Sequence, residues 1–130
     1  MNSEFVFKYH RYPIVPVKFI NQEHDRETPV IEGILDSGGD FIVIPMPIAK
    51  YLDLKLKKAG CVDTAGGSTS LFKSNLQMML GLKEKNVSYE NLEIHISNRE
   101  DIPVLIGRQP VFEDYEITFK KKLNQVILKK

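Results

Sequence analysis

Residues 34 to 45 read Ile34-Leu35-Asp36-Ser37-Gly38-Gly39-Asp40-Phe41-Ile42-Val43-Ile44-Pro45, two apolar runs joined by a short polar turn. Apolar runs rich in β-branched residues are typical of buried strands. Asp36 is therefore expected at the end of a buried strand, where a carboxylate is costly unless it is hydrogen-bonded or paired. Asp, Ser and Gly are also ordinary β-turn residues, so on this stretch alone a plain turn remains an alternative.

Length and composition limit the classes of protein that fit. The chain has 130 residues, 42% of them hydrophobic and 27% charged, which predicts one globular domain over residues 1–130. The formal net charge is +1, so no overall field favours nucleic acid or a membrane surface as a partner. Lysines gather at 120–122 and 129–130, and a solvated strand edge explains them more simply than a phosphate-binding patch.

Metal and disulfide chemistry find little support in the sequence. Cys61 is the only cysteine, and the three histidines are scattered along the chain, so we expect no metal site and no cofactor. The first residues lack the basic and apolar regions of a signal peptide, and no apolar run approaches the length that spans a membrane. These patterns predict a soluble, cytoplasmic protein.

Alternating apolar residues recur from one end of the chain to the other. They predict about nine strands in one all-β, mostly antiparallel domain. Short helical stretches are expected twice, at 47–52, where Pro47 suits a first helical turn, and at 109–114. His95 falls on the outward phase of its strand and is expected to be exposed.

A second glycine pair lies between two long strand-like arms. Gly66 and Gly67 join the segments 56–64 and 69–82, and a Gly-Gly pair between strands is a hairpin signal. Because the arms are long and moderately polar, the hairpin is expected to project from the body of the domain.

Three features stand in a fixed order: Asp36-Ser37-Gly38 after a strand, the Gly66-Gly67 hairpin, and Val104-Leu105-Ile106-Gly107-Arg108 before a short helix. This order resembles the retroviral-type, or retropepsin-like, aspartic proteases over roughly residues 14–130. The resemblance implies a closed β-barrel-type acid protease fold with a flap hairpin and one or two short helices.

The resemblance also implies a mechanism. Metal-free peptide hydrolysis needs one group that takes a proton from water and another that gives one to the carbonyl oxygen. Two carboxylates in contact perform both tasks, because close like charges share a proton. The chain has a single Asp-Ser-Gly, so the second acid must come from another copy, and an active enzyme must be a homodimer with Asp36 of each chain on the two-fold axis.

The remaining site residues follow from the same resemblance. Ser37 would hydrogen-bond across the axis, and Gly38 would let the backbone of a protein or peptide substrate approach closely. Substrate-binding roles also fall on Asp40 and on the flap tip, Gly66 and Gly67. Arg108, whose planar guanidinium suits a carboxylate partner such as Asp40, would support the site together with Gly107.

Two other readings remain open at this point. A module with the same fold that binds peptides or assembles without catalysis would have no need of an acid at the Asp36 turn. A small β-barrel that binds nucleic acid through Lys120 to Lys122 would show steep salt dependence.

Overall fold

The computed structural model describes residues 4–64 and 67–130. The strands are β1 (Glu4–Lys8), β2 (Ile14–Asn21), β3 (Arg26–Glu27), β4 (Ile31–Leu35), β5 (Val43–Pro45), β6 (Lys57–Thr64), β7 (Gly67–Leu82), β8 (Lys85–Ser97), β9 (Val104–Ile106), β10 (Glu116–Lys120) and β11 (Gln125–Lys129). The helical elements are α1 (Met46–Tyr51) and three single turns, η1 (Gln22–His24), η2 (Arg108–Phe112) and η3 (Lys121–Leu123). The all-β prediction with short helices near 47–52 and 109–114 is confirmed. The two-residue β3 was not expected, because the segment after Asn21 is polar.

Six strands close into a barrel. They follow the order β2-β4-β9-β5-β8-β7, and β7 returns to pair with β2. Most neighbours are antiparallel, but β4 runs parallel to β9, and β5 runs parallel to β8. Closure leaves these strands without a free edge over the paired residues, which suits a small β domain.

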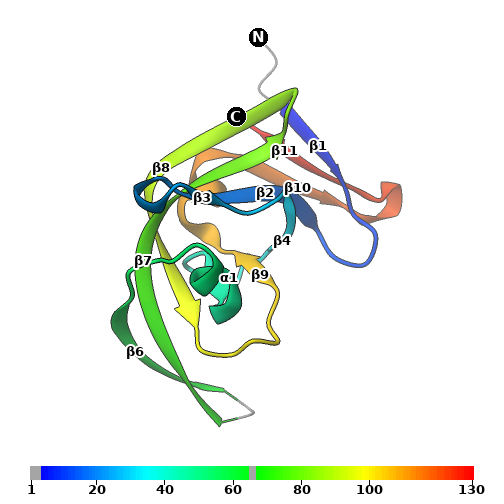
Figure 1. The fold of residues 1–130 in the computed structure, drawn as a ribbon. Coiled ribbons are helices and arrows are strands. Elements are labelled where there is room, and N and C mark those ends of the chain that lie inside the picture. The colour runs from blue at the N-terminus through cyan, green and yellow to red at the C-terminus, as the bar shows by residue number, and fades with distance from the viewer. Residues whose placement is uncertain (1–3, 65–66) are drawn as a thin grey trace.

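The hairpin of β6 and β7 extends beyond the barrel, as the sequence predicted (Figure 1). Its arms pair from Lys57 with Lys73 to Thr64 with Gly67. The far half of β7 pairs with β8 along most of its length and with β2, so one long strand belongs to both the hairpin and the barrel.

The chain ends form a sheet of their own. It has the order β1-β11-β10, with both neighbours antiparallel to β11 (Figure 1). Strand β11 is thus paired on both sides within one chain. Over the described residues, the edges of this small sheet are β1 and β10.

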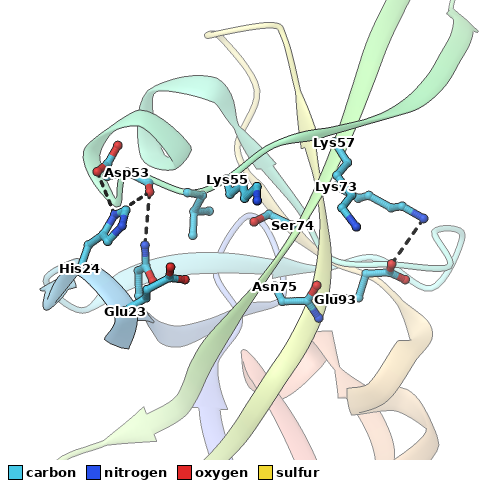
Figure 2. Close-up of a pocket in the computed structure, with 11 residues that line it drawn as sticks. Glu23, His24, Asp53, Lys55, Lys57, Lys73, Ser74, Asn75 and Glu93 are labelled. Atoms are coloured by element: carbon cyan, nitrogen blue, oxygen red, sulfur yellow. Dashed lines mark hydrogen bonds and ion pairs between the residues drawn. The ribbon is translucent and has the colours of Figure 1, made fainter.

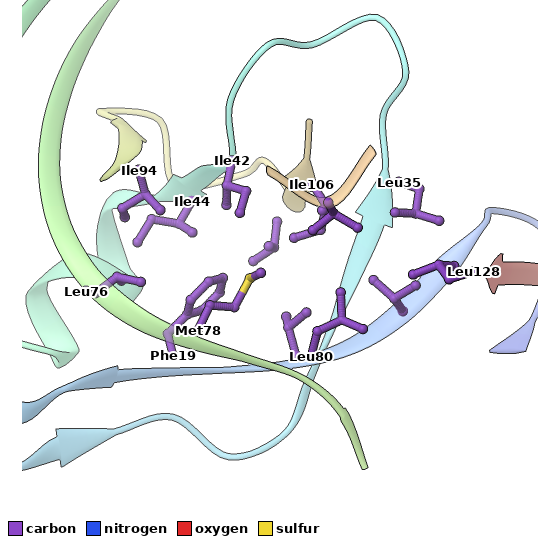
Figure 3. Close-up of a cluster of buried hydrophobic side chains, with 14 of the residues drawn as sticks. Phe19, Leu35, Ile42, Ile44, Leu76, Met78, Leu80, Ile94, Ile106 and Leu128 are labelled. Carbon is purple, nitrogen blue, oxygen red and sulfur yellow. The ribbon is translucent and has the colours of Figure 1, made fainter. Parts of the chain in front are cut away.

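The core lies inside the barrel and continues under the small sheet (Figure 3). Strand β2 shows how one face of a strand builds this core. Its residues alternate between buried and partly buried, and the side chains of Val15, Val17 and Phe19 are fully buried. Period-two alternation places every second side chain on one face of a strand. The other fully buried large side chains are Ile42, Ile44, Leu52, Met78, Leu80, Ile94, Ile96, Ile106 and Leu128.

Helix α1 ends against residues far away in sequence. The side-chain amide of Asn21 donates to the carbonyls of Leu52 (2.9 Å) and Asp53 (3.3 Å), and Arg26 donates to the carbonyl of Tyr51 (3.1 Å). The last carbonyls of a helix have no partner within it, so these side chains satisfy groups that would otherwise be unpaired. The β2–β3 hairpin thereby holds α1 against the barrel.

The prediction that His95 is exposed is wrong. Its ring lies 4.4 Å from the ring of Phe41, centroid to centroid, and the side chain is partly buried. The β8 alternation correctly placed His95 outside the barrel core. It gave no sign that the residues after the Asp36 turn would cover that face.

Candidate active site

Asp36 lies immediately after β4, at the point where β4 and β9 end side by side. Its backbone N–H donates to the carbonyl of Ile106, the last residue of β9, at 2.9 Å. Because β4 and β9 are parallel, their carboxyl ends meet at the same edge, and both polar segments that follow them begin there. Figure 3 shows the loop leaving its strand beside Leu35 and returning to the core beside Ile42.

A tight turn fixes the Asp36 carboxylate. The N–H of Gly38 donates to Asp36 Oδ1 at 3.1 Å, and the N–H of Gly39 donates to the Asp36 carbonyl at 3.2 Å. This is the local bonding by which Asp organises a turn. It compensates in part for placing a carboxylate, here partly buried, next to apolar strands.

The two residues that follow Asp36 lie at the surface of the described chain. Ser37 and Gly38 are both exposed. Among the described residues, a Cβ added at Gly38 would come within 4 Å of only one atom outside its chain neighbours, Asp36 Oδ1 at 3.5 Å. The space in front of the turn is therefore accessible to a substrate or to a second copy of the chain.

The loop that follows is fastened to the chain after β9. Backbone N–H groups of Arg108 and Gln109 donate to the carbonyls of Gly39 (2.8 Å) and Asp40 (2.9 Å). The guanidinium of Arg108 also donates to Asp40 Oδ1 and forms an ion pair with it. Two segments almost 70 residues apart are thus joined by three hydrogen bonds beside Asp36.

Gly107 sits where the two segments are closest. A Cβ at this position would lie 2.3 Å from the carbonyl oxygen of Phe41 and 2.7 Å from its nitrogen. Both neighbours are backbone atoms, which cannot rotate out of the way. The absence of a side chain at Gly107 is what lets β9 pass directly beneath the Asp36 loop.

The predicted flap tip falls partly outside the described residues. Gly66 is not among them, and Gly67 is described only as the first residue of β7, paired with Thr64 of β6. The structure thus brings together Asp36, Ser37, Gly38, Asp40, Gly107 and Arg108 at one edge of the barrel. Sequence reasoning gave no role to Phe41 and placed Ile106 only in the motif before Gly107, whereas backbone atoms of both residues complete this arrangement.

We expect Arg108→Ala to lower the free energy of unfolding of the isolated chain only modestly. The Arg108 and Asp40 side chains are 52% and 60% exposed, and exposed ion pairs contribute about 1 kcal/mol or less. The backbone bonds of residues 108 and 109 remain in this variant. Chemical denaturation at low protein concentration measures the effect, with Arg99→Ala as a control that removes another exposed Arg–Asp pair outside the Asp36 loop. A loss of about 3 kcal/mol or more would show instead that the side-chain pair holds the loop by itself.

A separate pocket of about 500 Å³ lies between the end of α1, η1 and the base of the β6–β7 hairpin (Figure 2). Its lining mixes acids and lysines, with ion pairs between His24 and Asp53 (2.8 Å) and between Lys73 and Glu93 (3.7 Å). None of the residues 36–41 line it. Since its charges are mixed and partly paired with one another, it is a weaker candidate for catalysis than the Asp36 turn.

Two features are absent from the described residues, 4–64 and 67–130. No group of three or more His, Cys, Asp or Glu side chains there is placed to hold a metal ion. No helix in this part of the chain is long and apolar enough to cross a membrane.

Comparison with solved structures gives the class of fold. The chain is similar to the crystal structure of a retropepsin-like aspartic protease from Rickettsia conorii, with a TM-score of 0.74, 18% identity, and coverage of 98% of this chain and 100% of that chain. It is also similar to EIAV protease complexed with the inhibitor HBY-793, with a TM-score of 0.55, 14% identity, and coverage of 82% and 91% respectively. Neither a protein-family model nor a curated protein matches the sequence. The chain therefore has the retropepsin-like fold that the motif order predicted.

Proposed function

We propose that this chain is an aspartic endopeptidase that acts on protein or peptide substrates as a homodimer, with one Asp36 from each copy. The observation that carries the proposal is the position of Asp36. It is a partly buried residue at the end of β4, its carboxylate is held by its own turn, and exposed Ser37 and Gly38 follow it. The sequence contains one Asp-Ser-Gly, so each copy supplies half of the pair.

In this mechanism a water molecule lies between the two carboxyl groups. One carboxylate takes a proton from the water as it attacks the peptide carbonyl, and the other, protonated carboxyl gives its proton to the carbonyl oxygen. Ser37 would join the two turns across the axis. No metal or covalent intermediate takes part.

The surrounding residues have positioning roles in the proposal. Exposed Gly38 allows the substrate backbone to approach, and Asp40, which Arg108 holds in place, accepts hydrogen bonds from it. The hairpin of β6 and β7, whose predicted tip is Gly66 and Gly67, would close over the substrate and exclude water. The likeness in fold to two solved aspartic proteases supports this assignment of parts.

The test is a joint measurement of mass and peptide hydrolysis. Light scattering across protein concentration, at about pH 5 and about pH 7, should show a two-fold mass, and hydrolysis should be faster at the lower pH because one carboxyl must carry a proton. Specific activity should rise with concentration in step with the dimer. A persistent monomer, or a dimer without hydrolysis on a diverse peptide library, would favour the non-catalytic peptide-binding module instead.

A further inference from the structure

The pocket between the end of α1, η1 and the base of the β6–β7 hairpin contains a buried hydroxyl group that the described chain leaves unused (Figure 2). Ser74 lies on the buried face of β7, in line with the core residues Leu76 and Met78 further along the strand. It is only 9% exposed, and its side-chain hydroxyl has no hydrogen-bond partner among the described residues. A buried hydroxyl without a partner costs free energy, so an incoming acceptor at this point would be favoured.

Three lysines reach the same pocket from three segments: Lys55 from the loop after α1, Lys57 from β6 and Lys73 from β7. Lys57 and Lys73 lie directly opposite each other in the β6–β7 ladder, an arrangement that is unfavourable for like charges. Glu93 relieves Lys73 in part, at 3.7 Å. Lys55 and Lys57 form no ion pair within the described residues. An anion bound between them would therefore offset a repulsion that the fold itself leaves in place.

The acids that line the pocket do not neutralise this group of lysines. Asp53 is already paired with His24, Oδ2 to Nδ1, at 2.8 Å. Figure 2 shows Glu23 and His24 on one side of the pocket and Ser74 with the lysines on the other. The pocket therefore has a positive end beside Ser74 and an acidic end, at Glu23, that can accept hydrogen bonds.

The composition of the lining narrows the class of ligand. Among the described residues that line the pocket there is one apolar side chain, Leu54, and there is no aromatic one. A nucleotide base would therefore find no ring to stack on, whereas hydroxyl groups would find polar partners. This lining also has no arginine, whose planar fork grips a carboxylate at two points, while lysine is a common point-charge partner of phosphate. The volume of about 500 Å³ is sufficient for a small molecule.

We propose that this pocket binds a phosphate monoester of a small polyhydroxylated molecule, such as a sugar phosphate. The phosphate oxygens accept hydrogen bonds from the Ser74 hydroxyl and from the Lys55 and Lys57 ammonium groups, three donors that belong to separate segments. The hydroxyl groups of the ligand extend toward Glu23. None of the residues 36–41 or 107–108 lines the pocket, so this site goes beyond the proposed peptidase and does not depend on it.

A titration followed by the amide chemical shifts of the isotopically labelled chain tests the site, with glucose 6-phosphate as the probe and the ionic strength held constant. Saturable shifts are expected at Lys57 and Ser74. Inorganic phosphate, which lacks the hydroxyl groups, and succinate, which lacks the phosphate, should bind more weakly. Ser74→Ala and Lys57→Gln should each raise the Kd for glucose 6-phosphate about tenfold. Neither change should lower the unfolding temperature, because Ser74 loses no side-chain hydrogen bond and Lys57→Gln removes a charge opposite Lys73.

Lys58→Gln is the matched control. It makes the same change of charge on the next residue of β6, which is exposed and lies outside the lining, so the Kd should equal that of the unchanged protein. The proposal is overturned if Lys58→Gln weakens binding as much as Lys57→Gln, if inorganic phosphate or succinate binds as tightly as glucose 6-phosphate, or if no saturable shift is seen. These outcomes leave the role proposed for Asp36 untouched, because peptide hydrolysis and dimer mass are measured separately.

Discussion

Replacing Asp36 with asparagine should lower kcat/KM for peptide hydrolysis by about 10³-fold or more, because a general acid–base group of this kind contributes up to about 10⁴-fold. The amide has nearly the shape of the carboxyl group and can still accept the hydrogen bond that the Gly38 N–H gives to Asp36 Oδ1. The fold and the dimer should therefore persist, as circular dichroism and light scattering would show. Unchanged cleavage by this variant would refute the role of Asp36.

Asp25→Asn is the matched control. Asp25 is exposed and has φ of 51°, a left-handed conformation that Asn tolerates well, so the same chemical change there should leave activity intact. Mixing offers a second readout. If each site needs two Asp36 residues, a ninefold excess of the Asp36→Asn chain should reduce wild-type activity to about one tenth by random exchange of subunits. Activity unaffected by the excess would mean that one chain is sufficient.

Gly107→Ala should cause the largest loss of stability among the substitutions considered. The new Cβ would lie within 2.8 Å of three backbone atoms of Phe41, so β9 and the Asp36 loop must separate. Overpacking against atoms that can adjust costs about 1–3 kcal/mol, and a rigid backbone neighbour should place this variant at or above about 3 kcal/mol. Urea denaturation measures the loss, and the soluble fraction on expression gives a second readout if the variant fails to fold.

Gly33→Ala is a useful comparison on the neighbouring strand. Its Cβ would meet the side chain of Ile106 at 2.9 Å and 3.1 Å, and that side chain can shift. We expect a loss of about 1 kcal/mol at this position. Equal losses for the two variants would show that the contact between Gly107 and Phe41 is less rigid than the geometry indicates.

Local pattern was enough to predict much of the fold. Strand alternation, as in Val15, Val17 and Phe19, follows directly from burial on one face, and Pro47 marked the start of α1. Local sequence pattern does not reveal which distant segments pair with one another. The parallel neighbours β4–β9 and β5–β8, and the capping of α1 by Asn21, depend on residues tens of positions apart.

The candidate site divides in the same way. The Asp-Ser-Gly turn could be predicted because its residues bond to one another, and the family resemblance implied that Arg108 would lie near Asp40. The contacts of Phe41 with His95 and Gly107 could not be predicted from the sequence. They form only because β8 and β9 lie on either side of β5 in the sheet. The second acid of the proposed dyad would come from another copy of the chain, so the fold of one chain does not contain it.

The position of β11 between β1 and β10 has a consequence for how the protein forms during synthesis. Strand β1 (Glu4–Lys8) is translated long before its partner β11, which spans residues 125–129. Until residues 125–129 have left the ribosome, β1 and β10 lack the strand that pairs with both of them. The aromatic side chains of Phe5 and Phe7 on β1 then have no neighbouring strand to pack beside. Contacts this distant in sequence form late and slowly. Chaperones that bind exposed aromatic segments would therefore be expected to engage β1 in the nascent chain and to release it only after β11 has been translated.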